Sequence, residues 1–163
     1  MTRTAEEREL FQSISDDDRR EARRIIPPGD VEALLKASAA DRVRYLVDEV
    51  LGQEEVWVAF DEYYLTGWDD SLNDVTVTPI WPHRQFVENF GMSQSNAWEP
   101  VPIPIVDWVD MVTPDLVAER RMLAVFPIDG LDFEITDPVA MVDQWEVAWK
   151  SFAKHWERFG DRI

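Results

Sequence analysis

The chain has 163 residues and a formal net charge of -17, from 33 acidic and 16 basic side chains. Its hydrophobic fraction of 45%, with 8 Trp and 8 Phe, is too high for a disordered chain and sufficient for the core of one domain. The absence of cysteine excludes disulfide bonds and thiolate metal sites. The acidity argues against binding to nucleic acid or to an anionic membrane.

The first residues carry mixed charge without the apolar segment of a signal peptide. No stretch of the sequence approaches the length of about 20 apolar residues that a membrane-spanning helix needs. We therefore expect a cytoplasmic protein.

The segment before Pro27-Pro28-Gly29 differs in charge from the rest of the chain. Its six Arg residues nearly balance its seven acidic residues, so the net negative charge belongs to the remainder. Consecutive prolines and a glycine stop a helix. We predict a helical N-terminal arm over residues 1–26 and a single domain over residues 27–163. Asp16-Asp17-Asp18 is interpreted as a helix cap, because it lacks the glycine and the terminal Glu of a calcium loop.

Two helices are predicted at the start of the domain, over residues 31–36 and 41–51. The second has apolar residues on one face and is followed by Gly52, where we expect it to end. The apolar residues are Val43, Leu46, Val47 and Val50.

A meander of strands follows these helices. Residues 56–60 form a continuous apolar run rich in β-formers, which is typical of a central strand. Residues 63–68 and 75–80 are predicted as strands joined across the polar turn 69–74. Proline has no N–H, so the last strand should end at Pro79 or lie at an edge.

The last of these strands leads directly into a helix. Pro82 fits the first helical turn, and Phe86, Val87 and Phe90 then lie on one face. Gly91 occupies the position of a left-handed cap, so we expect the helix to end there. Residues 92–97 read as a loop.

The next segment alternates proline with aliphatic residues and therefore lacks every second N–H. Such a segment can border a sheet on one side only. The three prolines are Pro100, Pro102 and Pro104. Short helices over residues 105–112 and 114–121 are predicted after it.

A second apolar strand over residues 122–126, the turn Asp129-Gly130 and a return strand over residues 131–135 predict a hairpin. A long amphipathic helix follows, with Asp137 as its cap and Gly160 just past its end. Its aromatic face either covers a sheet or forms the interface of a homo-oligomer. This face comprises Val142, Trp145, Trp149, Phe152, Trp156 and Phe159.

These elements predict an α+β protein with one mixed or antiparallel sheet of about five strands packed by helices. Their order resembles a bacterial family of small acidic proteins known as domain of unknown function 2750, over about residues 30–140. The matching motifs are Glu55-Val56-Trp57, Pro79-Ile80-Trp81-Pro82-His83-Arg84-Gln85-Phe86, Trp98, Ile103-Pro104, Trp108 and Leu123-Ala124-Val125-Phe126-Pro127. The resemblance implies a compact α+β domain and no established activity.

His83 is the natural candidate for chemistry, because a histidine can act as a general base near neutral pH. It follows Trp81 and precedes Arg84, and the three together could form a ligand site. No spacing supplies a nucleophile, a phosphate-binding glycine loop or a pair of metal-binding histidines. We therefore expect no catalytic residues, metal or cofactor, and interpret His83 as hydrogen-bonded near its helix start.

Acidic residues cluster around the predicted meander turns. They either solvate the turns or form a patch for a basic protein partner. They are Asp61, Glu62, Asp69, Asp70 and Asp74. The sequence favours a non-enzymatic, acidic protein-binding module, such as an immunity or inhibitor protein that sequesters a basic toxin. The alternative is a small enzyme or ligand-binding domain built around His83 and the neighbouring Trp residues.

Overall fold

The computed structural model describes residues 28–94 and 98–160, and the side chains of residues 30–90 and 98–151. The chain divides into two compact units, Met1–Ala37 and Ser38–Ile163. In the first unit the described element is helix α3 (Pro28–Lys36). The predicted arm, with Asp16-Asp17-Asp18, lies outside the described residues.

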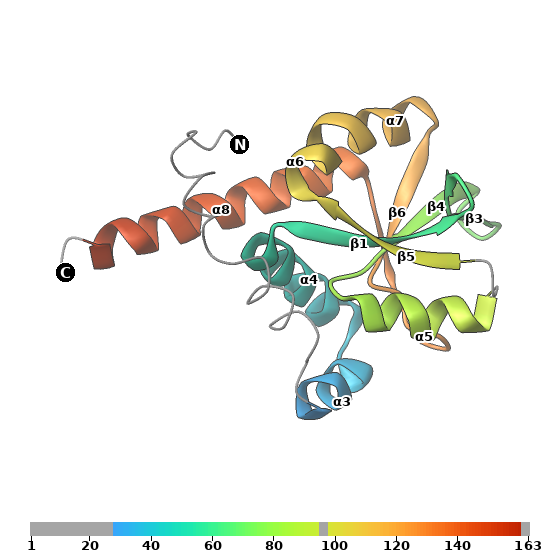
Figure 1. Cartoon of the computed structure of the whole chain (residues 1–163), viewed down its shortest axis with the longest axis horizontal. Helices are drawn as coiled ribbons and strands as arrows, with labels where there is room; N and C mark the ends of the chain where they lie inside the picture. Colours follow the sequence, from blue (N-terminus) through green and yellow to red (C-terminus); the bar gives the residue numbers. More distant parts are fainter. Residues whose placement is uncertain (1–27, 95–97, 161–163) are drawn as a thin grey trace. The chain divides into compact units, whose positions relative to one another are not determined.

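The second unit contains two sheets (Figure 1). The antiparallel first sheet has the order β2-β1-β5, formed by β1 (Glu55–Asp61), β2 (Tyr64–Leu65) and β5 (Trp98–Pro104). The second has the order β3-β4-β6-β7, formed by β3 (Trp68–Asp70), β4 (Val75–Ile80), β6 (Arg121–Val125) and β7 (Glu134–Thr136). Strands β4 and β6 are parallel and the other pairs antiparallel. The α+β class is confirmed, but the prediction of one sheet with about five strands is wrong.

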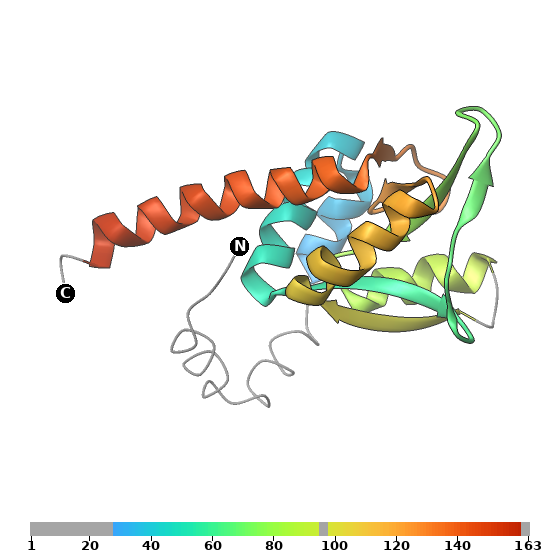
Figure 2. The same cartoon turned by 90° about the horizontal axis from the view of Figure 1, so that it is seen from above.

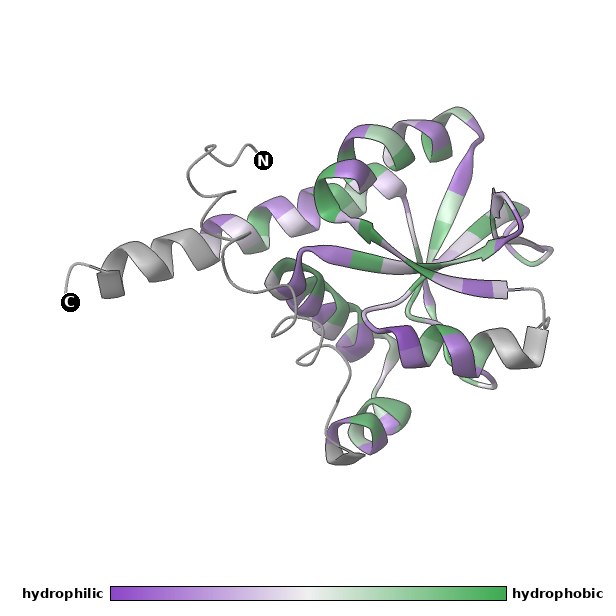
Figure 3. Ribbon diagram, viewed as in Figure 1, coloured by the Kyte–Doolittle hydropathy of each residue, from purple (hydrophilic) through white to green (hydrophobic). Residues whose placement is uncertain are grey.

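The two sheets are joined at one isolated bridge between β1 and the end of β4. The backbones of Trp57 and Trp81 exchange two hydrogen bonds of 2.9 Å each. Both side chains are buried, so the junction lies within the core. Strand β1 carries hydrophobic residues in its middle and hydrophilic residues toward its ends (Figure 3).

The predicted strand over residues 63–68 is divided between the sheets, because the chain passes from the first sheet to the second at Thr66 and Gly67. The backbone N and the Oγ1 of Thr66 both donate to the carbonyl of Ala59, at 3.0 and 2.8 Å. These bonds continue the pairing with β1 one residue past β2, and the chain then enters the second sheet as β3.

Pro79 lies in β4 where this strand has a neighbouring strand on one side only. Strand β4 continues through Pro79 to Ile80, so the expected end at Pro79 is wrong. β3 pairs with β4 only as far as Val77, and at Pro79 the partner is β6 alone. Phe126 N donates to Ile80 O, so the even-numbered residues of β4 bond to β6, and the position of the missing N–H at Pro79 faces the side without a partner.

Strand β5 borders the first sheet on one side only, as its prolines predict. Ile105 N, just past the strand, donates to Glu54 O at 2.8 Å. The backbone N–H and C=O groups of the odd-numbered residues of β5 therefore point toward β1. The nitrogens of Pro100, Pro102 and Pro104 face outward. From Pro100 to Pro104 this outer edge offers no backbone donors, which opposes strand addition.

Helix α4 (Ala39–Gln53) begins at Ser38, whose Oγ accepts the Asp41 N–H at 3.1 Å. The predicted apolar residues of its inner face are all buried. The helix continues through Gly52 and ends where Glu54 adopts φ 62°, so the expected end at Gly52 is wrong.

Helix α5 (Arg84–Gln94) begins two residues after Pro82 and continues through Gly91, which corrects both predicted ends. Phe86, Val87 and Phe90 are buried as predicted. Packing of this face therefore determines where the helix forms more than the residues at its ends do.

Three short helical segments precede β6. They are α6 (Ile105–Asp107), the π-helix η1 (Trp108–Val112) and α7 (Thr113–Ala118). Trp108 is fully buried. The helix predicted up to residue 121 ends earlier, because Arg120 adopts φ 57° and Arg121 already belongs to β6.

Helix α8 (Pro138–Gly160) begins as predicted, with the Asp137 carboxylate accepting the N–H groups of Val139 and Ala140 at 2.9 and 3.2 Å. It packs against α4, α7 and β6, where Trp145 is buried. Figure 2 shows its later turns continuing past α4. The aromatic side chains beyond Ser151 lie outside the described ones, so their role in self-association stays a prediction. No helix in the described ranges is long and apolar enough to cross a membrane.

Candidate functional site

A hollow of about 310 Å³ lies where the ends of the two sheets approach each other. Residues of both sheets line it, together with the segment that crosses from one sheet to the other. The lining residues are Asp61, Tyr64, Leu65, Thr66, Gly67, Trp68, Asp69, Thr76, Trp98 and Arg121.

One side of the hollow is a row of residues across the first sheet. Asp61 on β1 pairs with Tyr64 on β2 and with Trp98 on β5. Residues directly opposite each other on adjacent strands place their side chains on the same face of a sheet. This row, which we call the β1 row, therefore sets one carboxylate between two aromatic side chains.

The other side is a matching row across the second sheet. Thr76 on β4 pairs with Asp69 on β3 and with Arg121 on β6. The Thr76 hydroxyl donates to Asp69 Oδ1 at 2.8 Å. Arg121 Nε lies 2.8 Å from Glu119 Oε2, and Arg121 Nη1 donates to Leu65 O at 3.2 Å. This β4 row therefore contributes a carboxylate held by a hydroxyl and a guanidinium that is already paired.

Gly67 allows the crossing segment to lie directly against the second sheet. A Cβ atom at this position would lie 2.7 Å from Val77 O and 3.3 Å from Arg121 Nη1. Any larger residue would push the segment away from β4, so a glycine is required for the close approach.

The aromatic residues of the hollow rest on a packed aromatic layer. Trp68 stacks on Phe90 with ring centroids 5.8 Å apart, and Trp98 lies 6.4 Å from the same ring. Phe90 is buried, whereas Trp68 and Trp98 are half-buried. Their rings are therefore held in place before any ligand binds. Tyr64, which also lines the hollow, and its neighbour Tyr63 are 76% and 89% exposed.

The five acidic residues singled out in the sequence have different positions. Asp61 and Asp69 line the hollow. Glu62 and Asp74 occupy turn positions with φ 56° and 52°. The Asp70 carboxylate accepts the N–H of Leu72 at 3.0 Å and the amide of Asn73 at 2.9 Å. These hydrogen bonds lower the pKa of Asp70, chiefly through Asn73.

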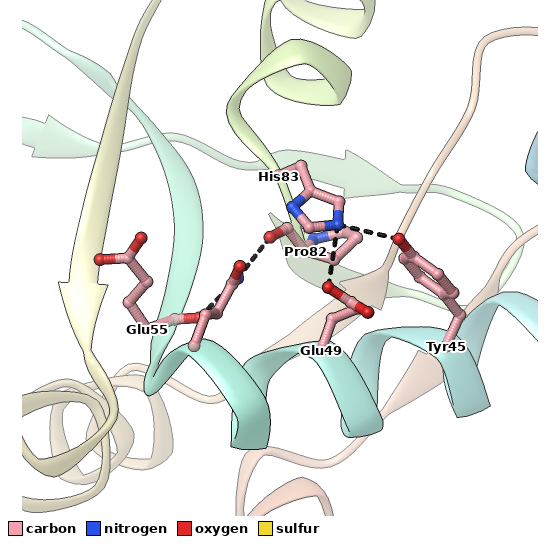
Figure 4. Close-up of polar contacts among 6 residues, drawn as sticks. Tyr45, Glu49, Glu55, Pro82 and His83 are labelled. Carbon is pink, nitrogen blue, oxygen red and sulfur yellow. Dashed lines mark hydrogen bonds and ion pairs between the residues drawn. The ribbon is translucent and has the colours of Figure 1, made fainter. Parts of the chain in front are cut away.

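The second candidate, His83, contacts helix α4 (Figure 4). Its Nε2 lies 2.9 Å from the Tyr45 hydroxyl and 3.2 Å from Glu49 Oε2. One turn further along α4, Gln53 Nε2 donates to the carbonyls of Pro82 and Glu55. Tyr45, Glu49 and Gln53 are spaced by four residues, which places them on one face of the helix. This spacing was the signal available in the sequence for the contact with His83.

Trp81 and Arg84 do not join His83 in one site. The Trp81 indole is fully buried and donates to Pro127 O at 3.0 Å. Arg84 Nε lies 2.7 Å from Glu88 Oε1 on the exposed face of α5. The His83 region is therefore a set of contacts between α4 and the start of α5.

Arg42, also on α4, is almost completely buried. Its guanidinium donates to the backbone carbonyls of Phe126, at 3.2 Å, and Asp132. Desolvation lowers its pKa, and the nearby charge of Asp132 opposes that effect. Among the described residues, no group of three His, Asp or Glu side chains is arranged to hold a metal ion.

The fold and the hollow define a small α+β protein with an acidic and aromatic recess between two sheets. Residues 43–144, more than half of the chain, match the family described as protein of unknown function (DUF2750), so the chain belongs to this family. The matched segment includes both the hollow and the His83 contacts, and it confirms the resemblance seen in the sequence. No curated protein and no solved structure matches the chain.

Proposed function

We propose that this protein is a non-enzymatic binding module that holds a basic protein partner at the hollow between the β1 and β4 rows. The observation that carries the proposal is the convergence of Asp61 and Asp69 from two sheets onto one recess with aromatic walls. An immunity or inhibitor protein that covers a basic toxin is the kind of module that fits this description.

Charge and exposure support binding to a basic protein. The net charge of -17 steers positively charged partners toward the chain and repels acidic ones. Tyr64, in the β1 row, and its neighbour Tyr63 are 76% and 89% exposed. Exposed tyrosines next to a recess are typical anchors of a protein interface. The recess would supply specificity, and the surrounding carboxylates would speed association.

The alternative, a small enzyme or ligand-binding domain around His83, receives less support. The Nε2 atom of His83 is already engaged by Tyr45 and Glu49. Trp81 and Arg84 point their polar groups to other partners. A general base needs an accessible atom within reach of a substrate proton. These contacts favour a structural role for His83.

Capture from a native lysate tests the proposal. Immobilised wild-type chain is compared with Asp61→Asn/Asp69→Asn and with the control Asp107→Asn/Asp110→Asn, which removes the same charge from exposed positions on α6 and η1. We expect wild type and control to retain the same basic protein at low salt and to release it at high salt. The hollow variant should lose it. Equal capture by all three proteins would contradict the proposal.

A further inference from the structure

We infer that the hollow accepts an arginine side chain of the partner, an inference that rests on the proposed binding function. The inference depends on three features of the lining residues: flat aromatic surfaces, carboxylates on opposite sides, and an internal cation that is already neutralised.

The aromatic surfaces suit a planar cation. Trp68 and Trp98, which both line the hollow, lie at interplanar angles of 29° and 32° to the ring of Phe90. A guanidinium group stacks on such rings through cation–π attraction and planar contact. Because both indoles are supported by buried Phe90, little conformational entropy is lost when a ligand stacks on them.

The carboxylates supply acceptors on both sides of the recess. Asp61 belongs to the β1 row and Asp69 to the β4 row. Thr76 donates to Oδ1 of Asp69, whose Oδ2 accepts no hydrogen bond from the described residues. The five N–H donors of a guanidinium point in several directions within one plane, so a single arginine can address acceptors from both rows.

Arg121 does not oppose a second cation strongly, because its own charge is compensated. Its Nε forms an ion pair of 2.8 Å with Glu119, and its Nη1 donates to Leu65 O and Thr78 Oγ1. The lining therefore keeps the net negative charge of Asp61 and Asp69. An anionic ligand would meet these two carboxylates and the field of a chain with net charge -17.

Arginine fits this lining better than lysine does. The lysine ammonium is a compact and strongly hydrated charge, which interacts best with acceptors gathered at one point. Here the acceptors stand on different sheets, and the aromatic side chains of Tyr64 and Trp98 lie beside Asp61 in the β1 row. A side chain that combines flat stacking with a fork of donors uses both features.

Titration of the full chain with blocked amino acids tests the inference. The probes are Nα-acetyl-arginine methylamide, its lysine counterpart and its neutral isostere citrulline. Binding is followed by NMR through the indole N–H signals of Trp68 and Trp98, each assigned with a Trp→Phe variant. We expect saturable shifts of both signals with the arginine probe, and binding weaker by on the order of tenfold with the lysine and citrulline probes.

The carboxylate variants complete the test. Asp61→Asn/Asp69→Asn should weaken arginine binding by on the order of tenfold, because the amide keeps the shape and loses the charge. The control Asp107→Asn/Asp110→Asn should bind as wild type does. Absence of shifts at the two indoles, or equal binding of arginine and citrulline, would overturn the inference. If lysate capture still depended on Asp61 and Asp69 in that case, the binding module would stand and only the arginine assignment would fall.

Discussion

Two regions of the second unit combine polar and aromatic side chains in opposite ways. In the first, which we call the α4 anchor, Arg42, Tyr45, Glu49 and Gln53 reach from one helix to neighbouring segments of the chain. In the hollow, Asp61, Asp69 and the aromatic residues around them line a recess open to solvent. The anchor directs its hydrogen bonds inward, and the hollow presents its acceptors outward.

The comparison separates structural from recognition roles. A buried polar group is stable only when its hydrogen bonds are formed within the protein, so the contacts that buried Arg42 and buried His83 make at the anchor are part of the fold. An exposed carboxylate needs no internal partner and contributes little to stability. Substitution of polar residues should therefore lower the free energy of unfolding in the anchor, and should weaken partner binding in the hollow.

The largest effect is expected at the anchor, for Arg42→Ala. The change removes the donors to the carbonyls of Phe126 and Asp132 and leaves a cavity beside α4. We expect the free energy of unfolding to fall by about 3 kcal/mol, measured by urea denaturation. The control is Arg44→Ala on the same helix, where an exposed ion pair with Asp41 is lost. Arg44→Ala should change the free energy of unfolding by no more than about 0.5 kcal/mol. Equal losses for Arg42→Ala and Arg44→Ala would contradict the structural role of Arg42.

An intermediate effect is expected for His83→Ala. Tyr45 and Glu49 lose their shared contact, so the free energy of unfolding should fall by about 1–2 kcal/mol. His83→Gln, which retains a donor in the side chain, should recover part of this loss. Capture of the basic partner should be unchanged in both variants, as measured by the pull-down described above. Loss of capture by a folded His83→Ala protein would instead favour a ligand site at His83.

The smallest effect is expected at Asp70, beside the hollow. Its folded-state pKa is lowered by hydrogen bonds from Asn73 and Leu72, so the ionised carboxylate stabilises the fold above its unfolded-state pKa of about 3.9. This contribution is lost as the pH falls through the lower, folded-state pKa. The difference in urea midpoint between wild type and Asp70→Asn should therefore be constant near neutral pH and shrink in acid. Asn73→Ala should reduce the difference, and a difference that persists in strong acid would contradict this account.

Most helices and strands could be predicted, because their burial follows from local periodicity. The apolar face of α4, the start of α8 at Asp137 and the one-sided pairing of β5 all agree with the structure. Helix ends were less predictable, since Gly52 lies inside α4 and the chain turns instead at Glu54. A favourable cap contributes about 1 kcal/mol, which packing of a buried face readily exceeds.

The candidate site could be predicted only in part. Asp61 and Asp69 were recognised as acidic residues near turns, but nothing local relates them to Trp98 or Arg121. These residues come together because the segment at Thr66 and Gly67 passes from one sheet to the other. Treating residues 63–68 as one strand hid this crossing.

The sequence by itself determined an acidic α+β chain, the buried faces of its main helices and strands, and the edge position of the proline-rich strand, because each depends on the period and chemistry of neighbouring residues. The tertiary structure alone decided that there are two sheets, that His83 contacts α4, and that two rows of side chains enclose one recess. Those features depend on which distant segments pair, and the pairing is set by the packing free energy of the whole core.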